Sequence, residues 1–211
     1  ILAMIFGINP ADINGSSTQP MQEQVQPAGE QNAQAFAQCQ KGTDADADLE
    51  CRVIGTVNSV QAFWAGELPH FGKEWQPTEQ FGSSAGPLAQ EYVVAHEYGH
   101  ALQDQLGLLG RAQQGQTGPD SGAVRIELMA DCLGGVWAHH ATTVKDPDTQ
   151  TPFLEPLTEQ DIKDALSAAS AVGDDSIQQK TQGRVTPENW THGSAEARQR
   201  WFLQGFRTGD L

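Results

Sequence analysis

The chain has little positive charge, few cysteines and no long apolar run. Its 211 residues contain 12 Lys and Arg against 27 Asp and Glu, which gives a formal net charge of −15. This excess of negative charge argues against nucleic acids and anionic membrane surfaces as partners. The sequence also lacks internal repeats, a phosphate-binding glycine loop and a convincing strand pattern. What remains is an acidic chain long enough to form one domain with a sizeable core.

The first residues form a short apolar run, Ile1 to Ile8, and eight residues cannot cross a bilayer, for which about 20 are needed. The run is either the end of a transmembrane helix or a short element that packs on the domain, and we favour the first. Residues 11–36 are rich in Gln, Gly, Ser, Pro and Asn, as polar linkers are. We therefore expect the end of a membrane anchor and a linker over residues 1–36, and a folded domain over residues 37–211.

The three cysteines divide into a pair and a single residue. Cys39 and Cys51 bracket an acidic, turn-rich loop, and a disulfide closing it would stabilise the fold by up to about 3 kcal/mol. Such a bridge would also indicate an oxidising compartment, and two free thiols are the alternative. Cys132 lies within an apolar helical pattern, so we expect it to be a buried free thiol.

Apolar side chains recur with a helical period along most of the chain. Pro87 suits the first turn of a helix, and Thr158 and Ser194 suit N-cap positions. We expect helices over residues 49–66, from Pro87 to about Gly107, over 121–143, from Thr158 to about Ala171, and after Ser194. The loop from Gly72 to Ser84 could contain a short hairpin. The sequence therefore predicts a mainly α fold, with α+β and a minor hairpin as the alternative.

One pentapeptide, His96-Glu97-Tyr98-Gly99-His100, reads H-E-x-x-H inside a helical pattern. Histidines four positions apart lie about 40° apart around a helix and one turn apart along it. Both imidazoles can then reach one metal ion, most often zinc, and Glu97 is placed to act on a water at that ion. The pattern also occurs by chance in helices, so alone it does not establish a metal site.

A second pattern, E-x-x-x-D, consists of Glu127 and Asp131, which share a helix face. Such pairs usually belong to a solvated acidic face, but this helix is otherwise apolar, and charges there are expected to be paired or bound to a metal. H-E-x-x-H followed by E-x-x-x-D resembles the gluzincins, the thermolysin-like metallopeptidases. By that resemblance Glu127 is the third zinc ligand and Asp131 accepts the free ring N–H of a ligating histidine. The fourth position then belongs to water.

Longer segments around the two motifs carry a family resemblance, over roughly residue 37 to residue 211. The segments that carry it are residues 57–64, 92–100, 127–138 and 191–194. They resemble the bacterial putative neutral zinc metallopeptidase family. The resemblance implies a zincin-like core with one zinc ion per chain. It also implies an N-terminal membrane anchor, with the catalytic domain outside the cytoplasm, either periplasmic or extracellular.

The chain departs from this family in the stretch before the H-E-x-x-H helix. Family members usually carry a longer segment there, with a second cysteine pair and a short strand that ends in an acidic residue. Here Gln76 to Gly86 is brief. Either this chain has lost the segment or a piece is missing from the sequence, and we favour the second. Loss of the segment would place an edge strand along the substrate cleft in doubt.

The mechanism expected from these motifs is hydrolysis of a peptide bond by a zinc-bound water. Glu97 takes the proton as the water attacks the scissile carbonyl and passes it to the leaving amine. His192, in a loop before the last helix, is our candidate donor to the oxyanion. Its alternatives are to cap that helix or to hold Asp131. Asp104, one turn after His100, is a candidate partner for the other ring nitrogen of that histidine.

Two functions therefore fit the sequence. The first is a zinc endopeptidase acting on peptide or protein substrates. The second is a zinc-stabilised binding or assembly module, without catalysis, on a peptidase frame. A structural zinc site closes its fourth position with a protein ligand and needs no carboxylate beside a water, so Glu97 favours the peptidase. The oligomeric state is not indicated by the sequence.

Gly99 is unusual because it stands inside the H-E-x-x-H helix. A glycine in a helix interior costs about 1 kcal/mol relative to alanine. Close packing against another helix, or room for a substrate beside the metal, would explain its presence.

Overall fold

Helices dominate the part of the chain that the computed structural model describes. That part comprises Cys39, Asp44 and residues 48–76, 87–112, 116–146 and 148–210, all within the unit Ala35–Leu211. The α-helices are α4 (Leu49–Glu67), α5 (Pro87–Gln105), α6 (Leu109–Ala112), α7 (Gly122–His140), α8 (Glu159–Ala171), α9 (Asp174–Gln182) and α10 (Ala195–Thr208). Two 3₁₀ helices are η2 (Leu68–Phe71) and η3 (Pro187–Asn189). No β-strand occurs in the described ranges, which confirms the mainly α fold.

The helix starts follow the capping residues of the sequence. Ser121 and Ser194 are the N-caps of α7 and α10, and each side chain accepts a hydrogen bond from a backbone N–H three residues later. Thr158 caps α8 in a reciprocal capping box with Asp161. These caps agree with the five expected helices, which correspond to α4, α5, α7, α8 and α10.

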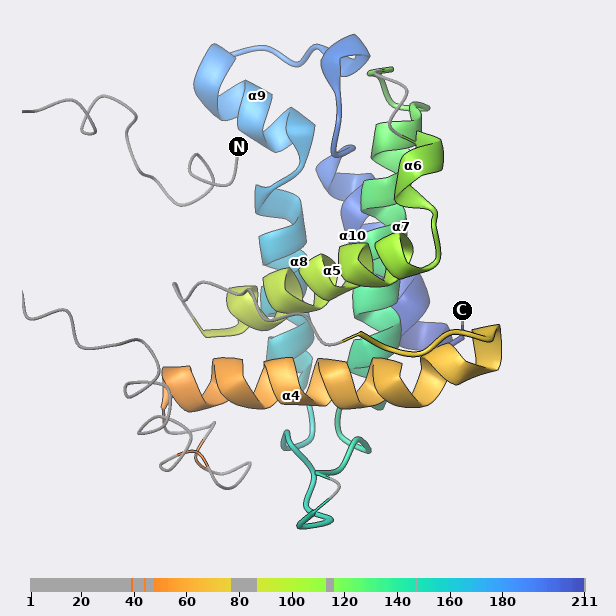
Figure 1. Cartoon of the computed structure of the whole chain (residues 1–211). Helices are drawn as coiled ribbons and strands as arrows, with labels where there is room; N and C mark the ends of the chain where they lie inside the picture. Colours follow the sequence, from red (N-terminus) through yellow and green to blue (C-terminus); the bar gives the residue numbers. More distant parts are fainter. Residues whose placement is uncertain are drawn as a thin grey trace, which may run out of the picture. The chain divides into compact units, whose positions relative to one another are not determined.

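Helix α5 lies at the centre of the packing. It packs against α4 on one side and against α7 and α8 on the other, while α10 packs along α7 and also touches α8. In Figure 1, α4 and α5 run side by side and cross α7, α8 and α10, which are drawn behind them. The motif helix therefore contacts α4 beside it and α7 and α8 behind it, and its side chains can meet those of α7.

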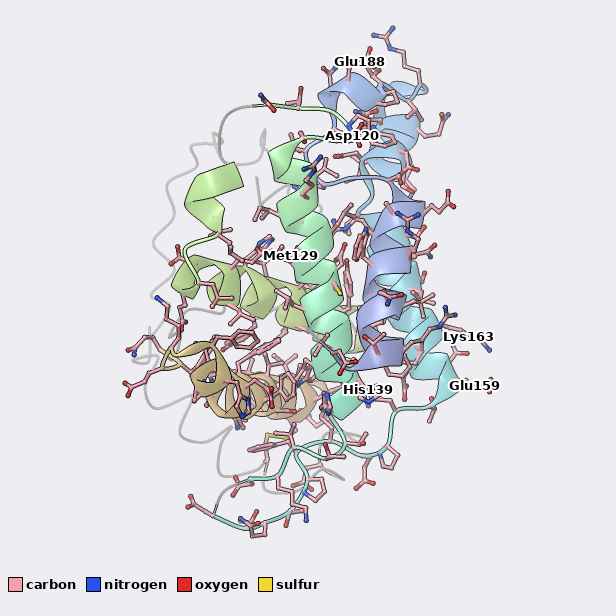
Figure 2. The ribbon with its side chains drawn as sticks, turned by 90° about the vertical axis from the view of Figure 1, so that its right-hand side faces the viewer. Asp120, Met129, His139, Glu159, Lys163 and Glu188 are labelled. Carbon is pink, nitrogen blue, oxygen red and sulfur yellow. A yellow bond between two sulfur atoms is a disulfide. The ribbon has the colours of Figure 1, made fainter. Side chains whose placement is uncertain are left out.

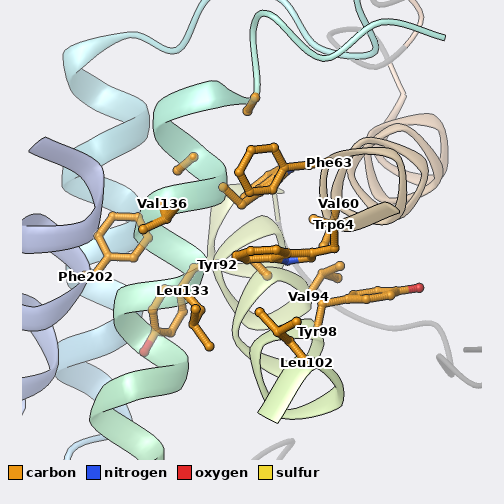
Figure 3. Close-up of a cluster of buried hydrophobic side chains, with 14 of the residues drawn as sticks. Val60, Phe63, Trp64, Tyr92, Val94, Tyr98, Leu102, Leu133, Val136 and Phe202 are labelled. Carbon is orange, nitrogen blue, oxygen red and sulfur yellow. The ribbon is translucent and has the colours of Figure 1, made fainter. Parts of the chain in front are cut away.

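The apolar core lies where these helices meet, and Figure 3 shows most of it. Trp64 from α4, Tyr98 from α5 and Phe202 from α10 are among the largest side chains that are fully buried. Burying such a side chain contributes about 1.5–3 kcal/mol, so these contacts fix how the helices sit on one another. Tyr98, between the two motif histidines, thus belongs to the core.

Helices α7 and α10 approach so closely that their crossing requires glycine. A Cβ atom added at Gly135 would lie 2.1 Å from the carbonyl oxygen of Phe202, and one at Gly205 would lie 2.0 Å from that of Cys132. The ends of the two helices are also linked, because His139 and His140 bond to the carbonyl oxygens of Phe206 and Gly209. Figure 2 shows His139 beside the end of α10.

The α5–α7 crossing explains the glycine in the motif. A Cβ atom added at Gly99 would lie 3.0 Å from the Cα and carbonyl oxygen of Ala130. Of the two explanations for Gly99, close helix packing therefore holds. The small residues at this point let the ligand-bearing faces of the two helices come together.

The bridge between Cys39 and Cys51 is present, and Cys132 is a free, partly buried thiol. Among the described helices, none combines the length and apolar character that a membrane crossing needs. The expected anchor and linker over residues 1–36, and most of the segment that could form a hairpin, residues 77–84, lie outside the described residues.

Candidate metal centre

His96 and His100 project from α5 toward the same point. Their Nε2 atoms lie 3.1 Å apart, as expected for histidines one helical turn apart that face one ion. His96 is buried, and His100 is partly exposed. Glu97 lies between them on the same helix and is half-buried.

Glu127 on α7 completes the group. Its Oε2 lies 3.3 Å from His96 Nε2, and its Oε1 lies 3.5 Å from His100 Nε2. Within the described ranges these three residues are the one group of His, Cys, Asp and Glu that could hold a metal ion. The structure therefore brings together the three residues expected to be ligands.

The other ring nitrogens fix the protonation of both histidines. His96 Nδ1 lies 2.8 Å from Asp131 Oδ1, and His100 Nδ1 lies 2.8 Å from Gln103 Oε1. The amide nitrogen of Gln103 donates to the carbonyl oxygen of Ile126, which leaves its Oε1 to accept. Both Nδ1 atoms are therefore donors, and in the neutral rings both Nε2 atoms carry a lone pair toward Glu127.

A divalent cation fits this donor set. Ligands placed tetrahedrally at about 2.0–2.1 Å from zinc lie about 3.3–3.4 Å from one another, close to the three distances above. Two imidazole lone pairs and a carboxylate repel one another unless a positive charge lies between them. Two histidine nitrogens and one carboxylate oxygen are also the ligand types that zinc uses in catalytic sites.

The electrostatics of the three groups also favour a bound cation. Burial lowers the pKa of His96, but hydrogen bonds to Asp131 and Glu127 outweigh it and raise this pKa to about 9. Burial raises the pKa of Glu127, yet its hydrogen bonds to His100 and His96 hold it well below its usual range. The cluster thus attracts positive charge, which a proton supplies when no metal is bound.

The partner of His100 differs from the sequence expectation. Asp104 is exposed, whereas Gln103 is fully buried and bonds to His100. Gln103 lies on the side of α5 that faces α7, so its side-chain amide can bond to His100 and to the backbone of Ile126 at the same time. The prediction for Asp104 was therefore wrong because spacing alone does not distinguish the third from the fourth residue after a histidine.

Asp131 on α7 is fully buried, and its hydrogen bonds link α7 to α5 and α10. Besides His96, it accepts hydrogen bonds from the hydroxyl of Tyr92 on α5 and from Arg198 on α10. Arg198 is not among the residues that the sequence motifs predict for the site. A signal was present, because Arg198 falls four positions before Phe202 and seven before Gly205, on the face that α10 buries.

His192 lies in the loop before α10, where Asp174 holds it. Oδ2 of Asp174 accepts the backbone N–H groups of Thr191, His192 and Gly193 at 2.7–2.9 Å. Its Oδ1 lies 3.3 Å from His192 Nδ1. This hydrogen bond raises the pKa of His192 against the opposing effect of burial, and the charge of Glu127 raises it further.

The loop that carries His192 packs on the first half of α7. A Cβ atom added at Gly193 would lie 3.2 Å from Val124 and 3.3 Å from Leu128, so the loop packs directly against the turn that carries Glu127. Ser194, not His192, caps α10. Asp174 was also missed from the sequence, since an aspartate in the first turn of a helix is too common to indicate a particular partner.

Fold and site together define a helical protein in which two histidines and one glutamate, on crossing helices, form a group that could hold a metal ion. The chain belongs to the family described as "Putative neutral zinc metallopeptidase", whose profile matches residues 74–211. The family resemblance seen in the sequence is thereby confirmed, and zinc is the metal that the family implies.

Relatives of this chain occur in mycobacteria and in Escherichia coli. The uncharacterized proteins Mb2605 of Mycobacterium bovis and Rv2575 of Mycobacterium tuberculosis are each 44% identical to it, over 99% of this chain and 82% of theirs. The uncharacterized protein YpfJ of Escherichia coli K12 is 42% identical over 82% of this chain and 54% of its own length. No solved structure matches the chain.

The mycobacterial relatives are longer than this chain within the matched region. The alignments extend over 246 residues, more than the 211 of this chain, so these relatives carry residues that this sequence lacks. Residues 77–86, where we expect the family's longer segment, lie outside the described residues.

Proposed function

We propose that the protein is a zinc-dependent peptidase, and specifically an endopeptidase. The observation that carries this proposal is the convergence of His96 Nε2, His100 Nε2 and the Glu127 carboxylate at 3.1–3.5 Å, with the far side of each ring already bonded. Membership in a zinc metallopeptidase family supports the same reaction class.

The number of protein ligands supports a catalytic rather than a structural role for the metal. Structural zinc sites are closed by four protein ligands, whereas catalytic sites have three and leave one position open. In the described ranges the group contains three residues. A zinc-stabilised module without catalysis remains the alternative that an experiment must exclude.

The chain's own residues supply the acid–base and electrostatic parts of the reaction. When bound, zinc lowers the pKa of a water molecule to about 7 and polarises the scissile carbonyl. Glu97 accepts the proton of the attacking water as the carbon–oxygen bond forms. It returns that proton to the nitrogen as the carbon–nitrogen bond breaks.

In this proposal His192 stabilises the charge that develops on the carbonyl oxygen. Its Nδ1 is bonded to Asp174, and its raised pKa favours a cationic ring whose Nε2–H can donate. Gly193, the next residue, packs on the turn of α7 that carries Glu127, and this contact supports a role for His192 near the metal.

We further propose that the domain acts on peptides or proteins outside the cytoplasm, attached through an N-terminal membrane anchor. The disulfide between Cys39 and Cys51 supports this location, because such bridges persist in oxidising compartments. The net charge of −15 makes nucleic acid an unsuitable substrate.

The test compares metal content and hydrolysis of an unstructured protein for the wild type and Glu97→Gln. We expect one zinc per chain in both and proteolysis in the wild type alone, because the amide of the variant cannot take up a proton. His70→Ala, which removes a side chain that is 71% exposed, is the control and should keep full activity. Zinc in both proteins with no proteolysis in either would instead favour the non-catalytic module.

A further inference from the structure

Asp131 has more hydrogen-bond partners than the orientation of one histidine requires. Its Oδ1 bonds to His96 Nδ1, to the Tyr92 hydroxyl and to Nη2 of Arg198 at 3.0 Å, and its Oδ2 accepts from Nε of Arg198 at 2.8 Å. The carboxylate is completely buried. A buried carboxylate is stable only when paired, so its partners decide where it lies.

Arg198 holds both oxygens of that carboxylate in a two-point fork. Nε and Nη2 are fixed in one plane, so the carboxylate cannot rotate without losing both hydrogen bonds. The guanidinium is anchored in turn, because Nη1 donates to the carbonyl oxygen of Val172 at the end of α8. Its side chain is 3% exposed, which leaves it inaccessible to a substrate.

Arg198 also borders the proposed ligands themselves. Nη2 lies 3.3 and 3.4 Å from the two ring nitrogens of His96, beside the ring rather than on one lone pair. It lies 3.9 Å from Oε2 of Glu127. One fixed cation therefore touches Asp131 and flanks two of the three groups that face the metal.

We propose that Arg198 is a positioning residue of the metal centre. Its fork fixes the carboxylate of Asp131 so that Oδ1 remains aimed at Nδ1 of His96, and this keeps Nε2 of His96 turned toward the metal. The inference rests on the proposed function only in that it requires the cluster to bind zinc; it does not require hydrolysis. Helix α10 thus sets the geometry of ligands on α5 and α7.

The experiment measures the dissociation constant for zinc and the visible absorption spectrum of the Co²⁺-substituted protein. Arg198→Met removes the cation at similar length, and Arg198→Lys keeps a cation but cannot form the fork. Arg200→Met, two positions along α10 and exposed, is the matched control. We expect zinc affinity to fall about 10- to 100-fold in Arg198→Met and less in Arg198→Lys. The control should bind as the wild type does.

The Co²⁺ spectrum distinguishes positioning from general stability. The absorption bands depend on the arrangement of the ligands, so they should shift in both Arg198 variants and not in Arg200→Met. If Arg198 acts through Asp131, adding Arg198→Met to Asp131→Asn should weaken zinc binding no further than Asp131→Asn alone. Should Arg198→Met fail to fold, the zinc affinity and Co²⁺ spectrum of Arg198→Lys, compared with the wild type, test the positioning role.

The possible outcomes separate this inference from the proposed function. Folded Arg198 variants with wild-type zinc affinity and an unchanged Co²⁺ spectrum would overturn the positioning role, whatever the activity. A wild type that binds zinc but hydrolyses nothing would overturn the proposed peptidase and leave the positioning role standing. A wild type that binds no zinc would overturn both.

Discussion

His192 is the residue whose contribution to the reaction can be isolated most cleanly. It is not among the three converging groups, so His192→Ala should leave zinc content unchanged. Removing one donor to an oxyanion lowers kcat about 10²- to 10³-fold, and we expect a loss of this order. Steady-state kinetics with a peptide substrate would measure it. A loss confined to KM, or no loss, would show that the imidazole does not act in the transition state.

Asp174 makes the stability of the folded protein depend on pH. Burial raises the pKa of Asp174, but hydrogen bonds from His192 and from the backbone outweigh it and lower this pKa. A carboxyl whose folded pKa is depressed stabilises the fold above its unfolded pKa, about 3.9, and loses that contribution as pH falls below it. Unfolding by urea should therefore show stability declining below about pH 4, with a weaker decline in Asp174→Asn. Equal acid dependence in both proteins would contradict this role.

Which site residues can be predicted from sequence depends on whether their partners are close along the chain. His96 and His100, and also Glu127 and Asp131, are pairs four positions apart, so helical periodicity alone places each pair on one face. Arg198 and Asp174 meet partners 67 and 18 positions away, and no local pattern records such a contact. Which residues Arg198 and Asp174 bond to depends on how the helices and loops pack in the folded chain.

The close crossing of α7 and α10 makes Gly205 sensitive to even one added carbon. Gly205→Ala gains helix propensity, about 1 kcal/mol, but its Cβ would lie 2.0 Å from a backbone oxygen that cannot move aside. Overpacking of this kind costs about 1–3 kcal/mol or more, so we expect net destabilisation. A lower midpoint of urea unfolding would record it.

The matched control for this prediction is Gly66→Ala near the end of α4. Apart from its chain neighbours and the backbone of its own helix, no residue has an atom within 4 Å of the Cβ position there, so the same change should be neutral or stabilise by up to about 1 kcal/mol. If both alanine variants behaved alike, the closeness of α7 and α10 would have no energetic consequence.

At the scale of elements, the long helices were predictable and the short ones were not. α4, α5, α7, α8 and α10 show an apolar period or a capping residue. In α9 and α6 these signals are weak. α9 spans nine residues with Ile177 as its one apolar side chain, and it is held by Gln178, which bonds to Thr186 and Trp190. Hydrogen bonds to the following loop therefore support this short helix in addition to its weak periodicity.

For the whole molecule, zinc should act as a cross-link between α5 and α7. Binding to the folded state alone stabilises by about 4 kcal/mol when free zinc is 1,000 times its dissociation constant. Removing the metal with a chelator should therefore lower Tm by roughly 10 °C for a domain of this size. Thermal unfolding with and without chelator tests this, with Glu127→Ala as the control that should not respond. A Tm unchanged after complete loss of zinc would show that the metal does not join the two helices.

The distance along the chain between Asp131 and Arg198 also bears on biosynthesis. The two residues are 67 positions apart, so at about 5–20 residues per second a ribosome makes the arginine roughly 3–13 s after the aspartate. During that interval the nascent chain already carries every proposed ligand but not the cation that orients one of them. If Arg198 positions Asp131 as proposed, a metal centre with native geometry has to wait until the ribosome has made α10.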